Sequence, residues 1–68
     1  MATGTVKSFN TGWGYGFITP DEGDKDIFVY TVDVEAARMA PLTEGQRISF
    51  YVVRTPRGLK ATNLNPAE

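Results

Sequence analysis

The stretch GWGYGFI, residues 12–18, has the residue types and spacing that point most clearly to chemistry. Aromatic side chains recur at every second position, at Trp13, Tyr15 and Phe17, with glycines between them. Successive side chains of a β-strand point to opposite faces, so a strand here would place the three rings on one face and bare backbone on the other. Glycine weakens a strand but lets a neighbouring backbone approach closely. The pattern therefore predicts close strand packing on one face and a row of rings on the other.

A second aromatic pair follows in the segment 26–30. Ile27 and Val29 share one face of an extended segment, and Phe28 and Tyr30 share the other. Ile18 lies opposite the rings of the first stretch. If the aliphatic side chains fill the core, both sets of rings point outward, and a contiguous aromatic patch usually marks a binding site. Nucleobases stack on such rings for about 1–3 kcal/mol each. The residues alone leave two interpretations open, a binding platform and an aromatic core.

Catalytic and cofactor chemistry has little support in the sequence. The chain has no cysteine and no histidine, which excludes disulfides and removes the commonest metal ligand and general base. The glycine pattern is not a dinucleotide-binding loop, because the residues that follow it, FITP, do not open a helix. The acidic residues at positions 21, 22, 24 and 26 are typical of a solvated turn and lack the spacing of a calcium-binding loop. We expect no enzymatic activity, cofactor or metal site.

The elements that must position these rings are short strands of a single domain, residues 1–68. Turn signals rich in Gly, Pro, Asn and Asp separate segments rich in aromatic and β-branched residues, a spacing typical of an all-β barrel or sandwich. The expected strands are residues 3–10, 14–19, 26–31, 46–54 and 59–64. In the apolar run ISFYVVRT, residues 48–55, alternation predicts that Ile48, Phe50 and Val52 face the core.

The segment from Val32 to Leu42 is expected to be a long loop containing one helical turn. Asp33 is a candidate N-cap before a short run of helix-forming residues, and Pro41 would end the turn. No other stretch has helical periodicity, which argues against an RNA recognition motif because that fold needs two helices.

The net charge is −1, which alone argues against a partner held mainly through its phosphates. The charges are unevenly placed, however. No acidic residue lies between Gln46 and Ala67, where Arg47, Arg54, Arg57 and Lys60 form a basic stretch. A weak net charge can thus conceal a usable basic strip.

The sequence also predicts a location. No apolar run approaches the roughly 20 residues that a membrane-spanning helix needs. The N-terminus lacks the basic and apolar segments of a signal peptide. We expect a cytoplasmic protein with no membrane partner.

Several short blocks together resemble the bacterial cold shock protein family. They are GTVKSFN at 4–10, GYGFI at 14–18, DIFVY at 26–30, GQRISF at 45–50 and ATNL at 61–64. The second block looks like the family's first RNA-binding motif, and IFVY looks like its second. The resemblance implies one cold shock domain, a five-stranded antiparallel Greek-key barrel of the oligonucleotide-binding (OB) type.

The resemblance also implies a partner and a site. Family members bind single-stranded RNA and DNA without a catalytic step, stacking bases on aromatic rings while basic residues follow the phosphates. Carried over to this chain, the site comprises Lys7, Asn10, Tyr15, Phe17, Asp26, Phe28, Tyr30 and Arg57. Asn10 and Asp26 would offer polar groups to base edges, and Arg57 would be the basic residue of the last loop. Arg54 or Lys60 would extend the phosphate path.

The chain departs from the family pattern at several of these positions. Ser8 replaces a tryptophan, Trp13 replaces a lysine, Tyr30 replaces a histidine, Thr31 replaces a phenylalanine and Met39 replaces a loop aromatic. Trp13 and Met39 join the candidate site, with the hypothesis that Trp13 lies over the face near Ser8 and partly replaces the missing ring. Weaker binding or a changed base preference is expected.

The function that the resemblance implies is that of an RNA chaperone, in which strands stacked on the protein cannot pair with each other. The alternative is a protein-interaction module on the same barrel, favoured by the acidic pI of about 5.3, the lost lysine and the lost aromatic residues. We expect a monomer with no small-molecule substrate, and a dimer formed through the aromatic face is the alternative.

Overall fold

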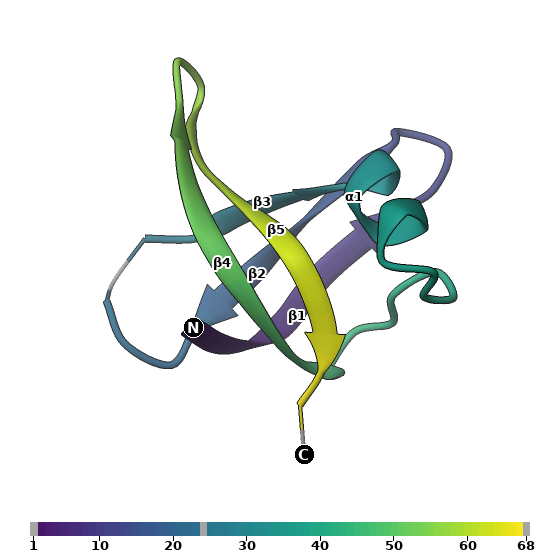
Figure 1. Ribbon diagram of the computed structural model, residues 1–68, viewed down its shortest axis with the longest axis horizontal. Coiled ribbons are helices and arrows are strands. Elements are labelled where there is room, and N and C mark those ends of the chain that lie inside the picture. The colour runs from purple at the N-terminus through teal and green to yellow at the C-terminus, as the bar shows by residue number, and fades with distance from the viewer. Residues whose placement is uncertain (1, 24, 68) are drawn as a thin grey trace.

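The computed structural model describes residues 2–23 and 25–67 and shows an all-β fold. Within these residues it contains five strands and one short helix. The strands are β1 (Ala2–Asn10), β2 (Tyr15–Pro20), β3 (Ile27–Tyr30), β4 (Arg47–Thr55) and β5 (Gly58–Pro66). Helix α1 (Thr31–Ala36) lies between β3 and β4 (Figure 1).

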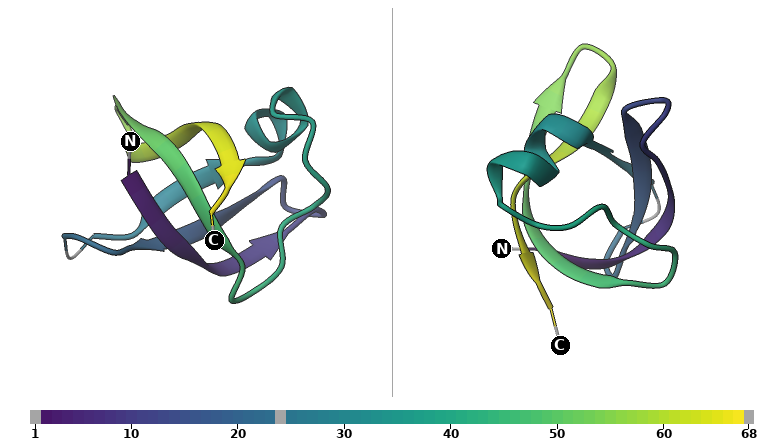
Figure 2. Two further views of the ribbon diagram at one scale, coloured as in Figure 1. Left: turned by 60° about the horizontal axis from the view of Figure 1, so that its bottom comes forward. Right: turned by 90° about the vertical axis from the view of Figure 1, so that its right-hand side faces the viewer.

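The strands close into a barrel in the order β1-β2-β3-β5-β4 (Figure 2). Strands β1, β2 and β3 form an antiparallel meander, and β4 pairs antiparallel with both β1 and β5. The barrel is closed by a parallel pairing between β3 and β5 at Phe28 and Lys60. The predicted five-stranded fold is confirmed, with this one parallel pairing inside the expected antiparallel barrel.

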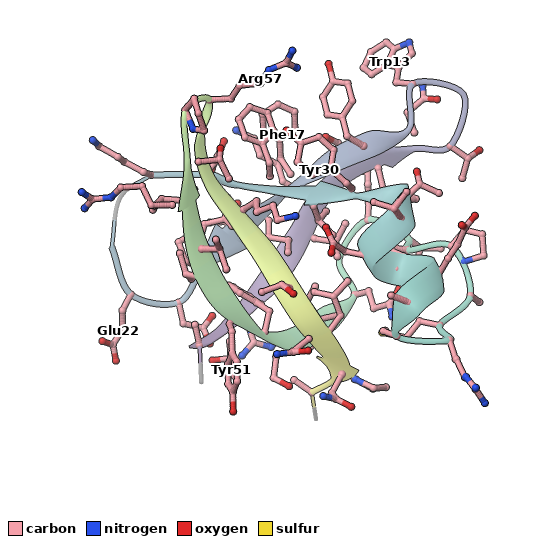
Figure 3. The ribbon with its side chains drawn as sticks, turned by 45° about the horizontal axis from the view of Figure 1, so that its top comes forward. Trp13, Phe17, Glu22, Tyr30, Tyr51 and Arg57 are labelled. Carbon is pink, nitrogen blue, oxygen red and sulfur yellow. The ribbon has the colours of Figure 1, made fainter. Side chains whose placement is uncertain are left out.

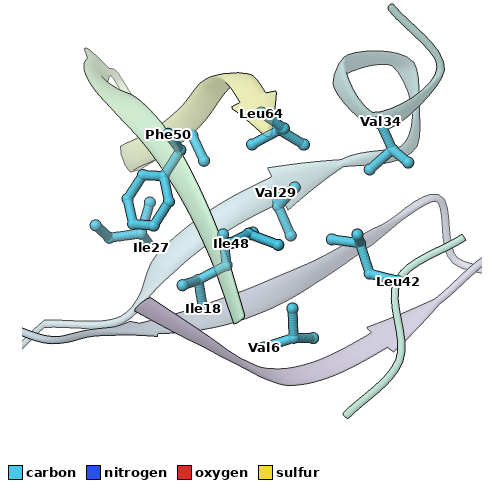
Figure 4. Packing of buried hydrophobic residues seen from close by; sticks show 10 residues of the cluster. Val6, Ile18, Ile27, Val29, Val34, Leu42, Ile48, Phe50 and Leu64 are labelled. Atoms are coloured by element: carbon cyan, nitrogen blue, oxygen red, sulfur yellow. The ribbon is translucent and has the colours of Figure 1, made fainter. Parts of the chain in front are cut away.

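The core fills the barrel with aliphatic side chains and a single large ring. Its buried members are Val6, Ile18, Ile27, Val29, Val34, Leu42, Ile48, Phe50, Ala61 and Leu64 (Figure 4). Ile18, Ile27 and Val29 point inward as their alternation predicts. The rings on the other face of β2 and β3 are therefore excluded from the core, which decides between the two interpretations left open by the residues.

The glycine between Tyr15 and Phe17 permits the close contact between β1 and β2. A Cβ on Gly16 would lie 2.6 Å from the Cα of Phe9 and would collide with the Ser8 carbonyl oxygen. The predicted close backbone approach is thus confirmed at Gly16. Nearby, β1 shifts register against β2 between Val6 and Ser8, an irregularity of the β-bulge type. As a result, the consecutive side chains of Lys7 and Ser8 are both exposed.

A network of polar side chains joins the end of β2 to the start of β4. Arg47 donates two hydrogen bonds to the Asp21 carboxylate, Nη1 to Oδ1 at 2.7 Å and Nη2 to Oδ2 at 2.6 Å. The Thr3 hydroxyl donates to Asp21 Oδ2 at 2.6 Å, and Arg47 Nη1 also donates to Thr5 Oγ1 at 3.0 Å. The Arg47 and Thr3 hydrogen bonds hold the pKa of Asp21 well below its ordinary range. Asp21 in turn raises the pKa of Arg47.

One local prediction for the barrel is wrong. Val52 was expected in the core but is 42% exposed, whereas Ser49 on the opposite face is buried. The β4–β5 hairpin extends beyond the body of the barrel (Figure 1), and the register of these strands shifts between Ser49 and Tyr51. Tyr51, Val52 and Val53 are all exposed because this part of β4 extends past the core, so alternation no longer reports burial beyond Phe50.

The helical turn also differs from the expectation. Helix α1 begins at Thr31, its N-cap position is occupied by Tyr30 and no side chain caps it. Asp33 lies inside the first turn, where a carboxylate is favourable near the helix N-terminus. The helix ends at Ala36, well before Pro41. No helix in the described part of the chain is long and apolar enough to cross a membrane.

Candidate nucleic-acid interface

Four aromatic rings on β2 and β3 form one surface, here called the ring platform: Tyr15, Phe17, Phe28 and Tyr30. The antiparallel register places Tyr15 opposite Tyr30 and Phe17 opposite Phe28. The centroids of Phe17 and Phe28 are 4.9 Å apart, and those of Tyr15 and Tyr30 are 6.4 Å apart. All four rings are partly exposed, and Figure 3 shows Phe17 and Tyr30 on the outer side of the barrel. The structure thus brings together all four predicted stacking residues.

Trp13 lies at one end of the ring platform. It belongs to the turn that precedes β2, so the prediction that it shares a strand face with Tyr15 is wrong. Its indole is 70% exposed and stacks on Tyr15, with centroids 6.0 Å apart and ring planes 30° apart. Ser8 pairs with Phe17, whereas Tyr15 pairs with Asn10. The indole therefore stacks at the Tyr15 end of the platform, which counts against the hypothesis that it replaces a ring near Ser8.

Asn10 has a structural role in the same turn. Its side-chain Oδ1 accepts a hydrogen bond from the Trp13 backbone N–H at 3.1 Å. Its backbone carbonyl accepts from the N–H groups of Trp13 and Gly14, at 3.2 and 3.0 Å. Asn10 was predicted to face base edges. Its side-chain oxygen is instead engaged by the turn that carries the indole.

Lys7 and Asp26, both predicted site residues, are paired with each other. Lys7 Nζ lies 2.9 Å from Asp26 Oδ2. The bulge in β1 directs the Lys7 side chain outward, and Asp26 directly precedes β3. A phosphate that approaches Lys7 must therefore compete with a carboxylate already bound to it, which weakens the attraction.

Arg57 lies in the β4–β5 turn beside the other end of the ring platform (Figure 3). Its backbone N–H donates to Thr55 Oγ1 at 3.1 Å, which holds the turn. A Cβ on the next residue, Gly58, would lie 3.9 Å from Cε2 of Phe28. Gly58 and the turn before it therefore lie close to the Phe28 ring of the platform. The Arg57 side chain in this turn is exposed.

Met39 is not part of the ring platform. Its side chain is partly buried against the hydrophobic core, and its N–H donates to the Val34 carbonyl at 3.1 Å. The segment after α1 therefore uses Met39 for packing. A loop methionine on its own gave no signal that distinguishes packing from ligand contact.

Lys60 and Asp33 lie beside Tyr30, a placement that the sequence did not indicate. Lys60 Nζ is 5.9 Å from the centroid of the Tyr30 ring and 3.4 Å from Asp33 Oδ2. Both side chains are largely buried, with 30% of Lys60 and 16% of Asp33 exposed. Lys60 thus links β5 to α1 at the edge of the platform. The signal missed was the parallel pairing of β3 with β5, which joins segments far apart in the sequence.

In the part of the chain that the structure describes, no group of three or more carboxylate, histidine or cysteine side chains is arranged to hold a metal ion. Asp24, the remaining acidic residue of the turn, lies outside the described residues.

A closed barrel with partly exposed rings on adjacent strands and cations at its edges is typical of the oligonucleotide-binding class of small β-barrels. The sequence pattern of the 'Cold-shock' DNA-binding domain matches residues 2–67, and the chain belongs to this cold-shock domain family. The chain is 47% identical over 64 residues to a cold shock-like protein CspA of Stigmatella aurantiaca, covering 94% of each chain. It is 46% identical over 69 residues to the cold shock protein CspA of Rhizobium meliloti, covering 98% of this chain and 100% of the relative. The resemblance seen in the sequence is confirmed.

Proposed function

We propose that this protein binds single-stranded RNA and DNA by stacking bases on the ring platform. The observation that carries the proposal is the pairing of Tyr15 with Tyr30 and of Phe17 with Phe28 on adjacent strands, which leaves four rings partly exposed in one contiguous surface. Every nucleobase has a flat face, so such a surface accepts bases with little regard to sequence. The aliphatic core beneath holds β2 and β3 in register and keeps the rings outside.

The polar side chains around the ring platform have different proposed roles in binding. Lys7 and Arg57 attract phosphates as the strand crosses the rings. Asp26 holds Lys7 in the ion pair that an incoming phosphate must displace. Asn10 orients the turn before β2. None of these roles includes a bond-breaking step, so the proposed function is binding alone.

The proposed biological activity is that of an RNA chaperone. Stacking between neighbouring base pairs stabilises a duplex by about 1.4 kcal/mol per step, and stacking on a protein ring contributes about 1–3 kcal/mol per base. The two stacking free energies are of similar size, so a strand loses little stacking free energy when it moves from a duplex to the rings. While it is held there, its bases cannot pair with another strand. Secondary structure then melts without an energy source. The protein acts as a monomer in this scheme.

The alternative, a protein-interaction module, draws on two observations. The net charge is −1, and Lys7 is already paired with Asp26. Both weaken the attraction for a polyanion. The ion pair involves exposed side chains, however, and such a pair contributes only about 0.2–1 kcal/mol, so a phosphate can displace the carboxylate.

The test is the salt dependence of binding to a fluorescently labelled oligothymidine, followed by anisotropy at several salt concentrations. For single strands, the logarithm of the association constant falls with the logarithm of salt by about 0.7 per phosphate contact. We expect saturable binding with a slope that corresponds to one or two contacts, reduced by about 0.7 in the variant R57Q. The matched control R38Q removes a cation from the segment after α1 and should leave the slope unchanged. Absence of binding by the folded protein would overturn the proposal in favour of the protein-interaction module.

A further inference from the structure

We propose that Trp13 forms an additional base-stacking position beyond Tyr15, so that the protein binds a strand one nucleotide longer than the ring platform alone accommodates. This inference rests on the proposed function. It adds to that function a position for a terminal base, at a residue that lies outside the strands carrying the platform. Three features of the turn before β2 carry it.

The first feature is the fixed backbone of the turn. Asn10 holds it from the β1 side through the hydrogen bonds to the N–H groups of Trp13 and Gly14. The Gly14 carbonyl accepts a hydrogen bond at 2.9 Å from the N–H of Thr31, at the start of α1. Gly14 itself has a φ of +86°, in the left-handed region that favours glycine. The indole therefore projects from a turn that is anchored on both sides, which lowers the entropic cost of using it as a stacking surface.

The second feature is the position of the indole in the row of rings. Trp13 stacks on Tyr15 with only 30° between the ring planes, the smallest angle that Tyr15 makes with any of its four neighbouring rings. The contact occupies one side of the indole, yet 70% of the Trp13 residue remains exposed. Together with the partly exposed rings beside it, the indole enlarges one contiguous apolar patch, and such patches mark interaction sites. The indole thus continues the platform and presents a large flat surface at its end (Figure 3).

The third feature is the absence of charge from the turn. Residues 11–14 are Thr, Gly, Trp and Gly, and none carries a positive charge that could form an ion pair with a phosphate. The occupant of this position is therefore held by its base and not by its backbone. Its contribution to affinity should change little with salt, unlike the contributions of Lys7 and Arg57.

The experiment measures the affinity of unlabelled protein for labelled oligothymidines of increasing length, three to eight nucleotides. Trp13→Ala removes the position, and Trp13→Phe is the matched variant that retains an aromatic surface. A second set of oligonucleotides of saturating length carries one abasic nucleotide, moved from each end inward. The free energy of unfolding of each variant is measured to establish that it is folded at the assay temperature.

For the wild type, affinity should rise with length up to a plateau, and W13A should reach its plateau one nucleotide earlier. One terminal abasic substitution should weaken wild-type binding about tenfold, as expected for about 1.4 kcal/mol of lost stacking, and should leave W13A unaffected. This difference between wild type and W13A in the effect of the terminal abasic nucleotide should persist at high salt. W13F should retain most of the wild-type behaviour.

Two results overturn the inference while leaving the proposed function intact. They are equal plateau lengths for wild type and W13A, or abasic substitutions that weaken both proteins equally at every position. Failure of the wild type to bind any oligothymidine would instead overturn the proposed function itself. Quenching of the fluorescence of Trp13, the only tryptophan, provides an independent readout. It should be strong with the full-length oligonucleotide and weaker with the terminal abasic one at saturation.

Discussion

Replacement of Phe28 by alanine should weaken binding of single-stranded nucleic acid while leaving the protein folded. Phe28 contacts all three other rings of the platform, with its centroid 4.9 Å from that of Phe17 and 6.1 Å from those of Tyr15 and Tyr30. In the variant, one base has no ring at position 28 on which to stack. The three neighbouring rings also lose their contacts with Phe28. Since one stacked base contributes about 1–3 kcal/mol, the dissociation constant should rise by about 5- to 150-fold.

The effect of the same substitution on stability follows from burial. Replacement of a fully buried phenylalanine by alanine lowers the free energy of unfolding of a protein by about 3–5 kcal/mol, partly because a cavity remains. Phe28 is only partly buried and its removal opens no enclosed cavity, because its outer side already faces solvent. Aromatic pairs contribute about 0.5–1.5 kcal/mol beyond their area. We therefore expect a loss of about 1–2 kcal/mol, small enough for the variant to remain folded at low temperature.

The assay is anisotropy with a labelled oligothymidine, together with urea denaturation of each protein to correct for any unfolded fraction. The matched control is Tyr51→Ala. Tyr51 is 49% exposed and lies on the side of the barrel opposite the ring platform in Figure 3, so its removal deletes an aromatic surface without changing the proposed site. Y51A should bind like the wild type. Wild-type affinity in folded F28A, or an equal loss in Y51A, would refute the assignment of binding to the platform.

Three further predictions concern charge and packing. Asp26→Asn releases Lys7 from its ion pair and should strengthen oligothymidine binding about two- to fivefold at low salt, with a smaller gain as salt rises. Asp21→Asn removes a carboxylate whose pKa Arg47 lowers, so the wild type should be more stable than D21N at neutral pH. That difference should be full above the ordinary pKa of 3.8 and decline as the pH falls below it. Gly16→Ala should destabilise the fold by about 2–3 kcal/mol, because the added Cβ collides with the β1 backbone.

Each of these predictions has a control in the same chain. Lys7→Gln should weaken binding where D26N strengthens it, and a loss in both variants would mean that Asp26 contacts the ligand directly. Glu22→Gln changes a neighbouring exposed carboxylate that forms no ion pair within residues 2–23 and 25–67, and it should not reproduce the acid sensitivity of D21N. Gly12→Ala should be tolerated, since its Cβ would meet only the Asn10 side-chain oxygen, at 3.1 Å. A G16A variant as stable as G12A would contradict the packing argument.

The strand pattern predicted the parts of this fold that depend on alternation. Ile18, Ile27 and Val29 face the core, and the four rings of the platform occupy the other face, because period-2 alternation reports which face a residue takes. Gly16 could likewise be interpreted from sequence, since only a close backbone neighbour explains a glycine between two rings. The fold and most of the stacking surface were therefore accessible from sequence.

The remaining features depend on partners that no local pattern encodes. The bulge that exposes Lys7 and the β4–β5 hairpin that carries Val52 beyond the core arise from the pairing of whole strands. The Lys60–Asp33 ion pair exists because β5 and α1 meet across the barrel. Trp13 lies in a turn because Gly14 adopts a positive φ, which ends the alternation before β2 begins. In each case the tertiary arrangement decided a feature that the sequence pattern left undetermined.

The most direct test of the central claim is a map of the binding surface by nuclear magnetic resonance, with oligothymidine added to protein labelled on its backbone amides and aromatic side chains. The ring platform should bind the strand. The largest shifts should then fall on the ring signals of Phe17 and Phe28 and the amides of β2 and β3, while Tyr51 should remain unchanged. Shifts gathered around Tyr51 and Val52, with the platform signals unmoved, would contradict the account.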